Sequence, residues 1–222
     1  RGPDDAQFYQ EPGCALGFRR LSIIDLAGGR QPMLNEDESK VLVFNGEIYN
    51  FQTIRQDLLA AGHIFKTNAD SEVILHGYEE YGPGLLNRLR GMFAFVIWDR
   101  EKKELFGARD FFGIKPLYYA QMGESFLFGS EIKSFLLHPD FKKELNEKAL
   151  ESYLSFQYSP GPETFFKNVY KLPPAHYFLY RDGKMEITRY WLPTFQAEEG
   201  RSLEEWADDI EKVFDNSVEA HK

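Results

Sequence analysis

The stretch with the clearest chemical potential is Asn45-Gly46-Glu47, which lies between an apolar segment and an amphipathic one. The Asn45 carboxamide can donate a hydrogen bond, and the backbone N–H of Gly46 is accessible because glycine carries no side chain. Two converging donors form an oxyanion hole, in which each donor typically accelerates a reaction by roughly 10²–10³. Glu47 would suit a bound ammonium group. The competing interpretation is a plain strand-to-helix turn, because Asn-Gly is a common turn signal.

Two further charged residues could complete a binding site. Arg20, in "FRRLSIID", could hold a carboxylate through two parallel hydrogen bonds, or it could be a surface arginine beside Arg19. Asp70, in "TNADSEVIL", could hold an ammonium group, or it could be an ordinary helix N-cap. A cation, an anion and an amide-binding corner together match a free amino acid that carries a side-chain amide.

Other chemistries have weaker support in the sequence. The five histidines show no i, i+4 pair and no Cys/His cluster, so we expect no metal site. No Gly-rich phosphate loop is present, because "GPGLLNRLRG" lacks the spacing and the Lys-Ser/Thr pair of that motif. Cys14 has no histidine nearby in the sequence and lies in a predicted strand, which favours a packed thiol over a nucleophile.

The composition limits the possible partners and location. Acidic residues number 35 and basic residues 26, for a net charge of −9, and no run of Lys and Arg indicates nucleic-acid binding. No apolar run approaches the ~20 residues that span a bilayer, and we see no signal peptide. The single cysteine excludes an internal disulfide framework. We therefore expect a cytoplasmic protein with neither nucleic-acid nor membrane partners.

The remaining pattern predicts the elements that position these residues. Apolar periodicity and turn signals predict two helices in the first half, over 48–62 and 70–82, and two further helices over 131–137 and 146–158. Short β-rich segments predict strands over 14–18, 21–25, 40–45, 91–99, 103–110, 116–121 and 125–130. We expect a covered loop over 159–174 and a hairpin over 176–191 that turns at Asp182-Gly183. Successive short strands favour antiparallel sheets and an α+β fold.

The last thirty residues differ from the rest. Polar and acidic composition after Trp191 predicts a domain boundary near 193–201. Ser202 and Glu205 form a predicted capping box. The apolar stripe that follows has helical spacing and needs a partner surface; its members are Leu203, Trp206, Ile210, Val213 and Phe214. We expect that surface to lie beyond Lys222, and the absence of an initiator Met predicts missing residues before Arg1.

A series of motifs in one order resembles the glutaminase domain of glutamine-hydrolysing asparagine synthetases. They are "RGPDD", "LGFRRLSIIDLAGGRQPMLNED", "VFNGEIYNF", "DSEVILHGYEEYG", "LRGMFAFVIWD", "ARDFFGIKPLYYA", "GSEIKSFLLHP" and "KLPPAHYFLY". The resemblance covers residues 1–192. It implies the N-terminal-nucleophile hydrolase fold, a four-layer αββα sandwich in which two stacked antiparallel sheets lie between helical layers.

The resemblance also implies roles for the candidate residues. Asn45 and the Gly46 N–H match the oxyanion hole, Arg20 matches the residue that holds the glutamine α-carboxylate, and Glu47 and Asp70 match those that hold the α-ammonium. Arg1 matches an arginine near the nucleophile. In the family a cysteine thiolate attacks the glutamine carboxamide and its own α-amino group acts as the base. The released ammonia reaches a second domain, where ATP activates aspartate.

Several features depart from the family pattern. The nucleophilic cysteine, activated by its own amino group, would lie roughly 30 residues before Arg1 on a strand that is missing here, so the chain alone should not hydrolyse glutamine. Phe18 and Phe111 stand where relatives often carry His and Arg, and we expect neither to touch the substrate groups. We therefore interpret 1–195 as the glutaminase domain and 196–222 as a linker and the first helix of an absent ATP-dependent synthetase domain.

The implied partners are glutamine and the synthetase domain of the same chain, with a homodimer left open. We expect no cofactor in this domain, and ATP and Mg in the synthetase domain. Two alternatives stay open. The same glutaminase could serve another acceptor domain, such as one that closes β-lactam rings, cyclises lasso peptides or amidates cell-wall or sugar intermediates. The domain could also be a non-catalytic scaffold that has lost its nucleophile. The sequence on either side of this chain would discriminate between them.

Overall fold

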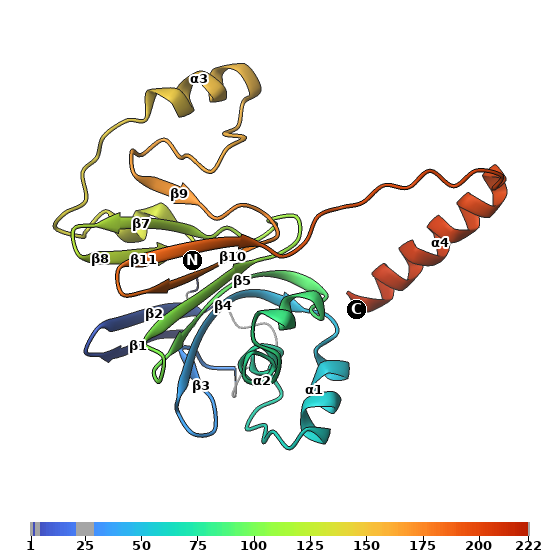
Figure 1. The fold of residues 1–222 in the computed structure, drawn as a ribbon, viewed down its shortest axis with the longest axis horizontal. Helices are drawn as coiled ribbons and strands as arrows, with labels where there is room; N and C mark the ends of the chain where they lie inside the picture. The colour runs from blue at the N-terminus through green and yellow to red at the C-terminus, as the bar shows by residue number, and fades with distance from the viewer. Residues whose placement is uncertain (1, 3–4, 21–28, 222) are drawn as a thin grey trace.

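The computed structural model describes residue 2, residues 5–20 and residues 29–221 (Figure 1). Its strands are β1 (Asp5–Glu11), β2 (Cys14–Arg20), β3 (Met33–Leu34), β4 (Lys40–Ile48), β5 (Gly91–Asp99), β6 (Glu104–Arg109), β7 (Tyr118–Met122), β8 (Ser125–Gly129), β9 (Val169–Lys171), β10 (His176–Arg181) and β11 (Lys184–Arg189). Its α-helices are α1 (Phe51–Ala60), α2 (Glu72–Tyr81), α3 (Glu147–Phe156) and α4 (Leu203–Ala220), and its 3₁₀ helices are η1 (Gly82–Asn87) and η2 (Ile132–Phe135).

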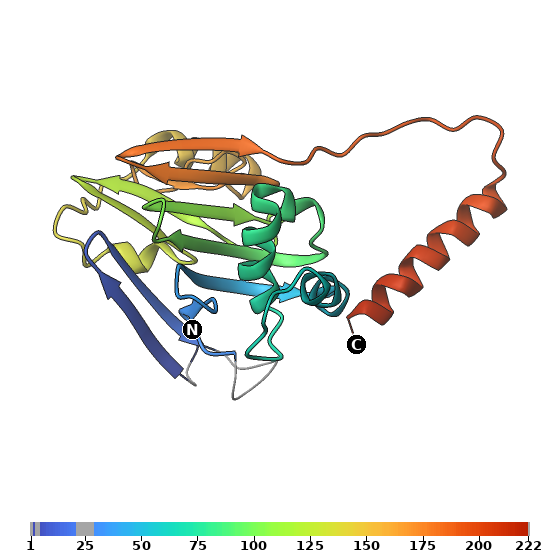
Figure 2. The same ribbon diagram turned by 60° about the horizontal axis from the view of Figure 1, so that its bottom comes forward.

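The strands form three antiparallel sheets among the described residues. The largest has the order β11-β10-β6-β5-β4-β3, and the smaller ones are β1-β2 and β8-β7-β9. All their pairings are antiparallel. This confirms the predicted α+β class with antiparallel sheets. The second layer of the expected sandwich is divided here between the two smaller sheets (Figure 2).

Strict alternation along the central strands sends side chains to both faces of the six-stranded sheet. On β5, Phe93, Phe95 and Ile97 pack with the apolar side chains of α1 and α2, which cover one face. The intervening Ala94, Val96 and Trp98 belong to a separate core on the other face. That second core includes Leu16 of β2, Tyr119 of β7 and Leu172 after β9, so it joins the six-stranded sheet to both smaller sheets.

An outer layer covers the three-stranded sheet on its far side. Phe135 of η2, with Phe141 and Phe166, packs on Ala120 and Met122 of β7. α3 buries Ala149 and lies farther out (Figure 1). The order is therefore helix, sheet, sheet and a mixed outer layer, as the resemblance implies.

α4 stands apart from these layers. It follows an extended segment after β11 (Figure 2), and although the structure describes α4 throughout, none of its residues is buried. The predicted capping box is confirmed, because the Ser202 side chain accepts from the Glu205 N–H while the Glu205 carboxylate accepts from the Ser202 N–H. The C-terminal end of α4 approaches the main body, where Arg90 donates to the Ser217 hydroxyl at 3.1 Å.

Most predicted elements are confirmed, with identifiable exceptions. The hairpin turns at Asp182-Gly183, where both residues have positive φ as a tight turn requires. The expected loop over 159–174 is wrong in part, because β9 lies within it and pairs with β7. The predicted strand over 21–25 falls outside the described residues.

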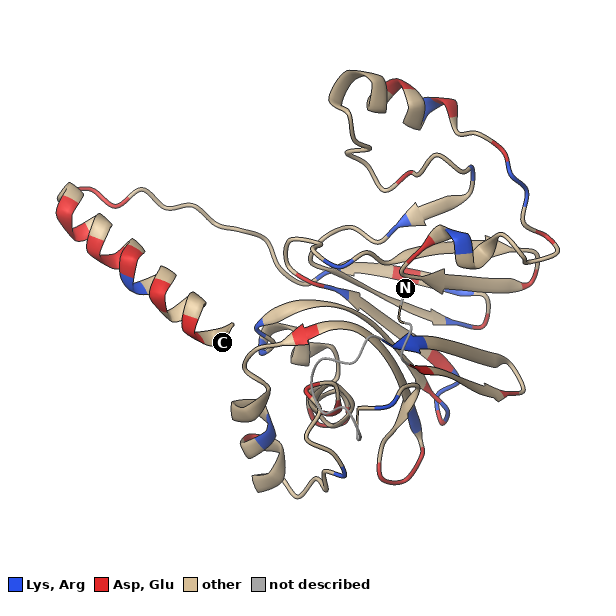
Figure 3. Ribbon diagram, turned by 180° about the vertical axis from the view of Figure 1, so that it is seen from behind, with Lys and Arg blue, Asp and Glu red and all other residues tan. Residues whose placement is uncertain are grey.

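The surface charge follows the composition. Figure 3 shows acidic segments repeating along α4 and Lys and Arg distributed over several elements. Among the helices that the structure describes, none combines the length and apolar character needed to cross a bilayer.

Candidate active site

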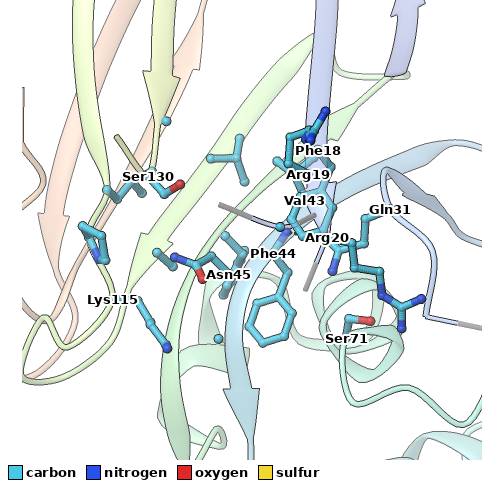
Figure 4. A pocket seen from close by; sticks show the side chains of 18 of the residues that line it. Phe18, Arg19, Arg20, Gln31, Val43, Phe44, Asn45, Ser71, Lys115 and Ser130 are labelled. Carbon is cyan, nitrogen blue, oxygen red and sulfur yellow. Dashed lines mark hydrogen bonds between the residues drawn. The ribbon is translucent and has the colours of Figure 1, made fainter. Parts of the chain in front are cut away.

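A cavity of about 880 Å³ lies between the six-stranded sheet and the two smaller sheets. Among the residues that line it are all five predicted site residues, Arg20, Asn45, Gly46, Glu47 and Asp70. Figure 4 shows Arg20, Gln31 and Ser71 on one side and Asn45, Lys115 and Ser130 on the other, with Phe44 between them. The structure thus brings together residues that are up to fifty positions apart in the sequence. Arg1 lies outside the described residues.

The alternation of β4 explains why Asn45 faces this cavity. Leu42, Phe44 and Ile48 pack toward α1 and α2, so Asn45, between Phe44 and Gly46, points to the space between the sheets. Gly46 is required by the close approach of β5, because a Cβ atom at this position would lie 2.1 Å from the Met92 carbonyl oxygen. The neighbouring strand therefore explains the glycine.

Asp70 is not the helix N-cap that the simpler interpretation expected. Ser71 occupies that position, and the Asp70 carboxylate instead accepts from the Ile48 N–H at 2.9 Å, which joins the start of α2 to the end of β4. Asp70 is 7% exposed. Burial raises the pKa of its carboxyl and the nearby Glu47 adds to the effect, although hydrogen bonds from Ile48 and Ser71 oppose it.

A raised pKa means that keeping Asp70 ionised at neutral pH costs free energy of folding. We expect Asp70→Asn to raise the thermal midpoint of the ligand-free protein at pH 7, since Asn still accepts from Ile48 but carries no charge. The pKa of Asp70 is higher in the folded protein than in the unfolded chain. The free-energy cost of ionising Asp70 is therefore largest at pH values above both pKa values, and it disappears as the pH falls below them. The advantage of the variant should therefore shrink between pH 7 and pH 4 in thermal melts. A lower midpoint at pH 7 would contradict this assignment.

Arg20 is not a surface residue, so that alternative is wrong. It ends β2 with 7% of its surface exposed, whereas Arg19 is exposed. β2 alternates in the same way as β4, which turns the two adjacent arginines to opposite sides. A buried guanidinium at a cavity wall is a strong site for a carboxylate, because Arg can donate two parallel hydrogen bonds to it.

The loop of the "RDFFGIKPLYY" motif is held by buried charge. The Asp110 carboxylate is 1% exposed and accepts from the backbone N–H groups of Phe93, Phe112, Ile114 and Lys115. The preceding Arg109 donates to the carbonyl oxygens of Gly113, Lys115 and Leu172. These bonds fix the path of 110–117, which places Lys115 and Pro116 at the cavity wall.

Asp110→Asn should destabilise the fold. The Asn amide group would face backbone donors, and leaving such donors unpaired costs roughly 1–3 kcal/mol in the free energy of unfolding. Urea denaturation of both proteins measures this difference. Asp182→Asn is the matched control, since Asp182 is exposed at a hairpin turn where Asn is well tolerated. Equal losses in the two variants would contradict the proposed role of Asp110.

Sequence reasoning missed part of the cavity wall. Gln31 accepts from the Phe44 N–H at 2.6 Å through its side chain, and Ser71 and Ser130 also line the cavity. No spacing in the sequence indicated these residues, because they come from separate loops. Phe18 lines the cavity as well, so it is nearer to the predicted substrate site than expected. Phe111 instead contacts the rings of Phe93, Tyr190 and Trp191.

Cys14 has the properties of a packed thiol. It lies on β2 and packs at the edge of the core between the sheets. Burial raises the pKa of its thiol to about 12, so at neutral pH it carries a proton and is a poor nucleophile. These properties make Cys14 a poor candidate for a nucleophile.

Comparisons with known proteins give the cavity a context. A family described as "Glutamine amidotransferase domain" matches residues 1–191. Asparagine synthetase 1 of Bacillus subtilis strain 168, named as glutamine-hydrolyzing, is 42% identical over 214 residues, which cover 95% of this chain and 34% of that protein. Amidase chyE of Penicillium rubens is 36% identical over 220 residues, covering 96% of this chain and 32% of that one. The chain spans about a third of the length of these curated relatives.

The fold is also found among solved structures. The glutamine phosphoribosylpyrophosphate amidotransferase of B. subtilis, solved with ADP and GMP, superposes with a TM-score of 0.58 at 21% identity. The match covers 81% of this chain and 35% of that one. This likeness supports the layered architecture described above.

Proposed function

Because the chain belongs to the family of glutamine amidotransferase domains, we propose that it binds glutamine in the cavity between its sheets and releases ammonia from the side-chain amide. One observation carries this proposal. The buried cation Arg20, the buried anion Asp70 and the Asn45-Gly46 corner all line the same cavity. In this proposal the opposite charges are assigned to the α-amino-acid end of glutamine and the amide donors to its side-chain end.

In the proposed binding mode, Arg20 holds the α-carboxylate while Asp70 and Glu47 hold the α-ammonium. The substrate's positive charge then offsets the cost of keeping Asp70 ionised beside Glu47. The Asn45 side chain and the Gly46 N–H receive the amide oxygen when it becomes negative during attack. Preorganised donors of this kind favour the transition state more than the ground state, which raises the rate.

The attacking thiol is proposed to come from outside these residues, because Cys14 is protonated and packed in the core. A cysteine that uses its own α-amino group as base would supply both nucleophile and base in one residue. Attack would form a thioester and expel ammonia, and water would then release glutamate and restore the thiol.

We propose that the ammonia amidates aspartate, in an ATP- and Mg-dependent synthetase domain of the same protein. The similarity to asparagine synthetase 1 supports this acceptor. Residues 196–222 would form the linker and the first helix of that domain, while 1–195 form the glutaminase. The apolar stripe of α4 is exposed at Leu203, Ile210 and Phe214, as expected of a surface made to be covered. A homodimer and a cytoplasmic location stay predictions.

A second hypothesis is that the ammonia goes to an acceptor other than aspartate, which the similarity to amidase chyE supports. The cavity that binds the nitrogen donor would be the same, and the product amide would differ. The third hypothesis is a scaffold without catalytic activity that has lost its nucleophilic cysteine.

One assay separates these functions. The protein that carries this chain is incubated with glutamine, and glutamate release is measured with and without ATP and aspartate. We expect glutamate release in both conditions and asparagine only when ATP and aspartate are present. Glutamate without asparagine would favour another acceptor, and no glutamate in either condition would contradict a glutaminase.

A further inference from the structure

We propose that two histidines and two glutamates, clustered on α2 and on two loops beside it, bind a zinc ion. These residues, called here the His–Glu cluster, are Glu36, His63, His76 and Glu79. One ligand atom from each lies within 4.8 Å of the others. The cluster joins three segments, because Glu36 lies between β3 and β4, His63 follows α1, and the other two lie on α2.

The distances fit a four-coordinate ion. His76 Nδ1 lies 3.2 Å from a Glu36 carboxylate oxygen and 3.1 Å from Glu79 Oε2. His63 Nδ1 lies 3.8 Å and 3.9 Å from oxygens of the same two carboxylates. Tetrahedral zinc with bonds of about 2.0–2.2 Å places its ligand atoms roughly 3.3–3.6 Å apart. The four ligand atoms lie within 4.8 Å of one another, so rotation of the partly exposed Glu36 and His63 side chains would be needed to bring all four atoms to bonding distance.

The sequence signal for this site is a helical i, i+3 pair. His76 and Glu79 lie on one face of α2, one turn apart. The expectation of no metal site rested on the absence of i, i+4 histidine pairs and of Cys/His clusters, so it did not consider a histidine paired with a glutamate. Glu36 and His63 reach this face from loops that are distant in the sequence.

Each histidine has a carboxylate near its Nε2 atom, on the side of the ring opposite the cluster. His63 Nε2 lies at a hydrogen-bond distance of 3.3 Å from Glu80 Oε2, whereas His76 Nε2 lies 3.5 Å from Glu72 Oε1 and makes no hydrogen bond within the described part of the chain. Glu72 is itself held by the backbone N–H groups of Lys66 and Thr67. An outer carboxylate of this kind orients a metal-binding histidine and keeps the proton on the nitrogen that faces away from the metal. At His63 the outer carboxylate is Glu80, and in both histidines Nδ1 faces Glu36 and Glu79.

Glu79 is also prepared for binding. Its Oε1 accepts from the buried Asn35 side-chain amide at 2.5 Å, which leaves Oε2 directed at both histidines. His76 is buried with 1% of its side chain exposed, while the Glu36 side chain is partly exposed. An ion could enter from the Glu36 side and would be shielded from solvent on the His76 side.

The charge of the cluster favours a cation. Four carboxylates, those of Glu36, Glu72, Glu79 and Glu80, surround the two imidazoles. Burial alone would lower the pKa of His76, but Glu72, Glu79 and Glu36 raise it to about 9. A proton on His76 is thus the competitor that zinc must displace. Four protein ligands leave no open position, so the site would be structural and would fasten the Glu36 and His63 loops to α2.

Zinc binding to the metal-free protein that carries this chain tests the proposal. Binding is measured calorimetrically against a competing chelator in four proteins: wild type, His63→Ala, Glu36→Gln and the control His138→Ala. His63 and Glu36 are partly exposed, so either variant can be made with little risk to the fold, and thermal melts verify folding. His138 lies outside the cluster and controls for the loss of one histidine.

We expect wild type and His138→Ala to bind one equivalent of zinc that raises the thermal midpoint. His63→Ala and Glu36→Gln should weaken that equivalent by roughly 100-fold or more, since removing only an outer partner typically costs ~10–100-fold. Co²⁺ at the same site should give the strong visible absorption of a tetrahedral complex. Equal zinc affinity and stoichiometry in wild type and both cluster variants would overturn the proposal, as would the absence of bound zinc in wild type.

Discussion

Asn45→Ala should lower glutamine-dependent turnover by roughly 10²–10³, while ammonia-dependent product formation stays near the wild-type rate. The reason is the position of Asn45 on the cavity side of β4, where its amide can meet the oxygen of the glutamine side chain. The Gly46 N–H would remain, so some stabilisation of the negative oxygen is retained. Steady-state rates with glutamine and with ammonium salts, measured on the protein that carries this chain, give the comparison.

The ratio of the two rates makes this test specific. A variant that merely disturbs the fold would lose activity with both nitrogen donors. Asn87→Ala is the matched control, because Asn87 is exposed at the end of η1 and does not line the cavity. Equal losses with glutamine and ammonia in Asn45→Ala would refute the oxyanion role.

Arg20→Ala should raise the glutamine KM by about 10- to 150-fold. A hydrogen bond to a charged group contributes roughly 1.5–3 kcal/mol, which converts to that range. Because Arg20 would hold the α-carboxylate and not the reacting amide, we expect the larger effect in KM and a smaller one in kcat. Initial rates over a range of glutamine concentrations separate the two constants.

Arg20→Lys extends the test. It keeps the positive charge but loses the paired donors of the guanidinium, so its KM should fall between those of wild type and Arg20→Ala. Arg189→Ala, on the exposed strand β11, controls for the loss of an arginine. An unchanged KM in a folded Arg20→Ala protein would remove Arg20 from the binding site.

The sequence predicted the fold best where one physical signal dominated. The Asp182-Gly183 hairpin and the Ser202 capping box are local, and both are present as expected. Strand β9 was missed because it contains three residues between Pro- and Gly-rich stretches. Pairing with β7 stabilises it, and no local pattern reports a tertiary contact of that kind.

The candidate site was predicted from residue chemistry together with the family resemblance. The burial of Arg20 and Asp70 could not be predicted, since the same residues suit a surface arginine and a helix cap. Their burial depends on strand alternation and on the contact between Asp70 and Ile48, which joins segments 22 positions apart. The His–Glu cluster was missed for the same reason, because two of its members come from loops that meet α2 only in three dimensions.

A crystal structure of the protein that carries this chain, with L-glutamate bound, tests the proposed binding mode most directly. The product has the same α-amino-acid end as glutamine and a carboxylate in place of the amide. We predict its α-carboxylate on Arg20, its α-ammonium between Asp70 and Glu47, and its side-chain carboxylate on Asn45 and the Gly46 N–H. Glutamate bound in the reverse orientation, or outside this cavity, would contradict the proposal.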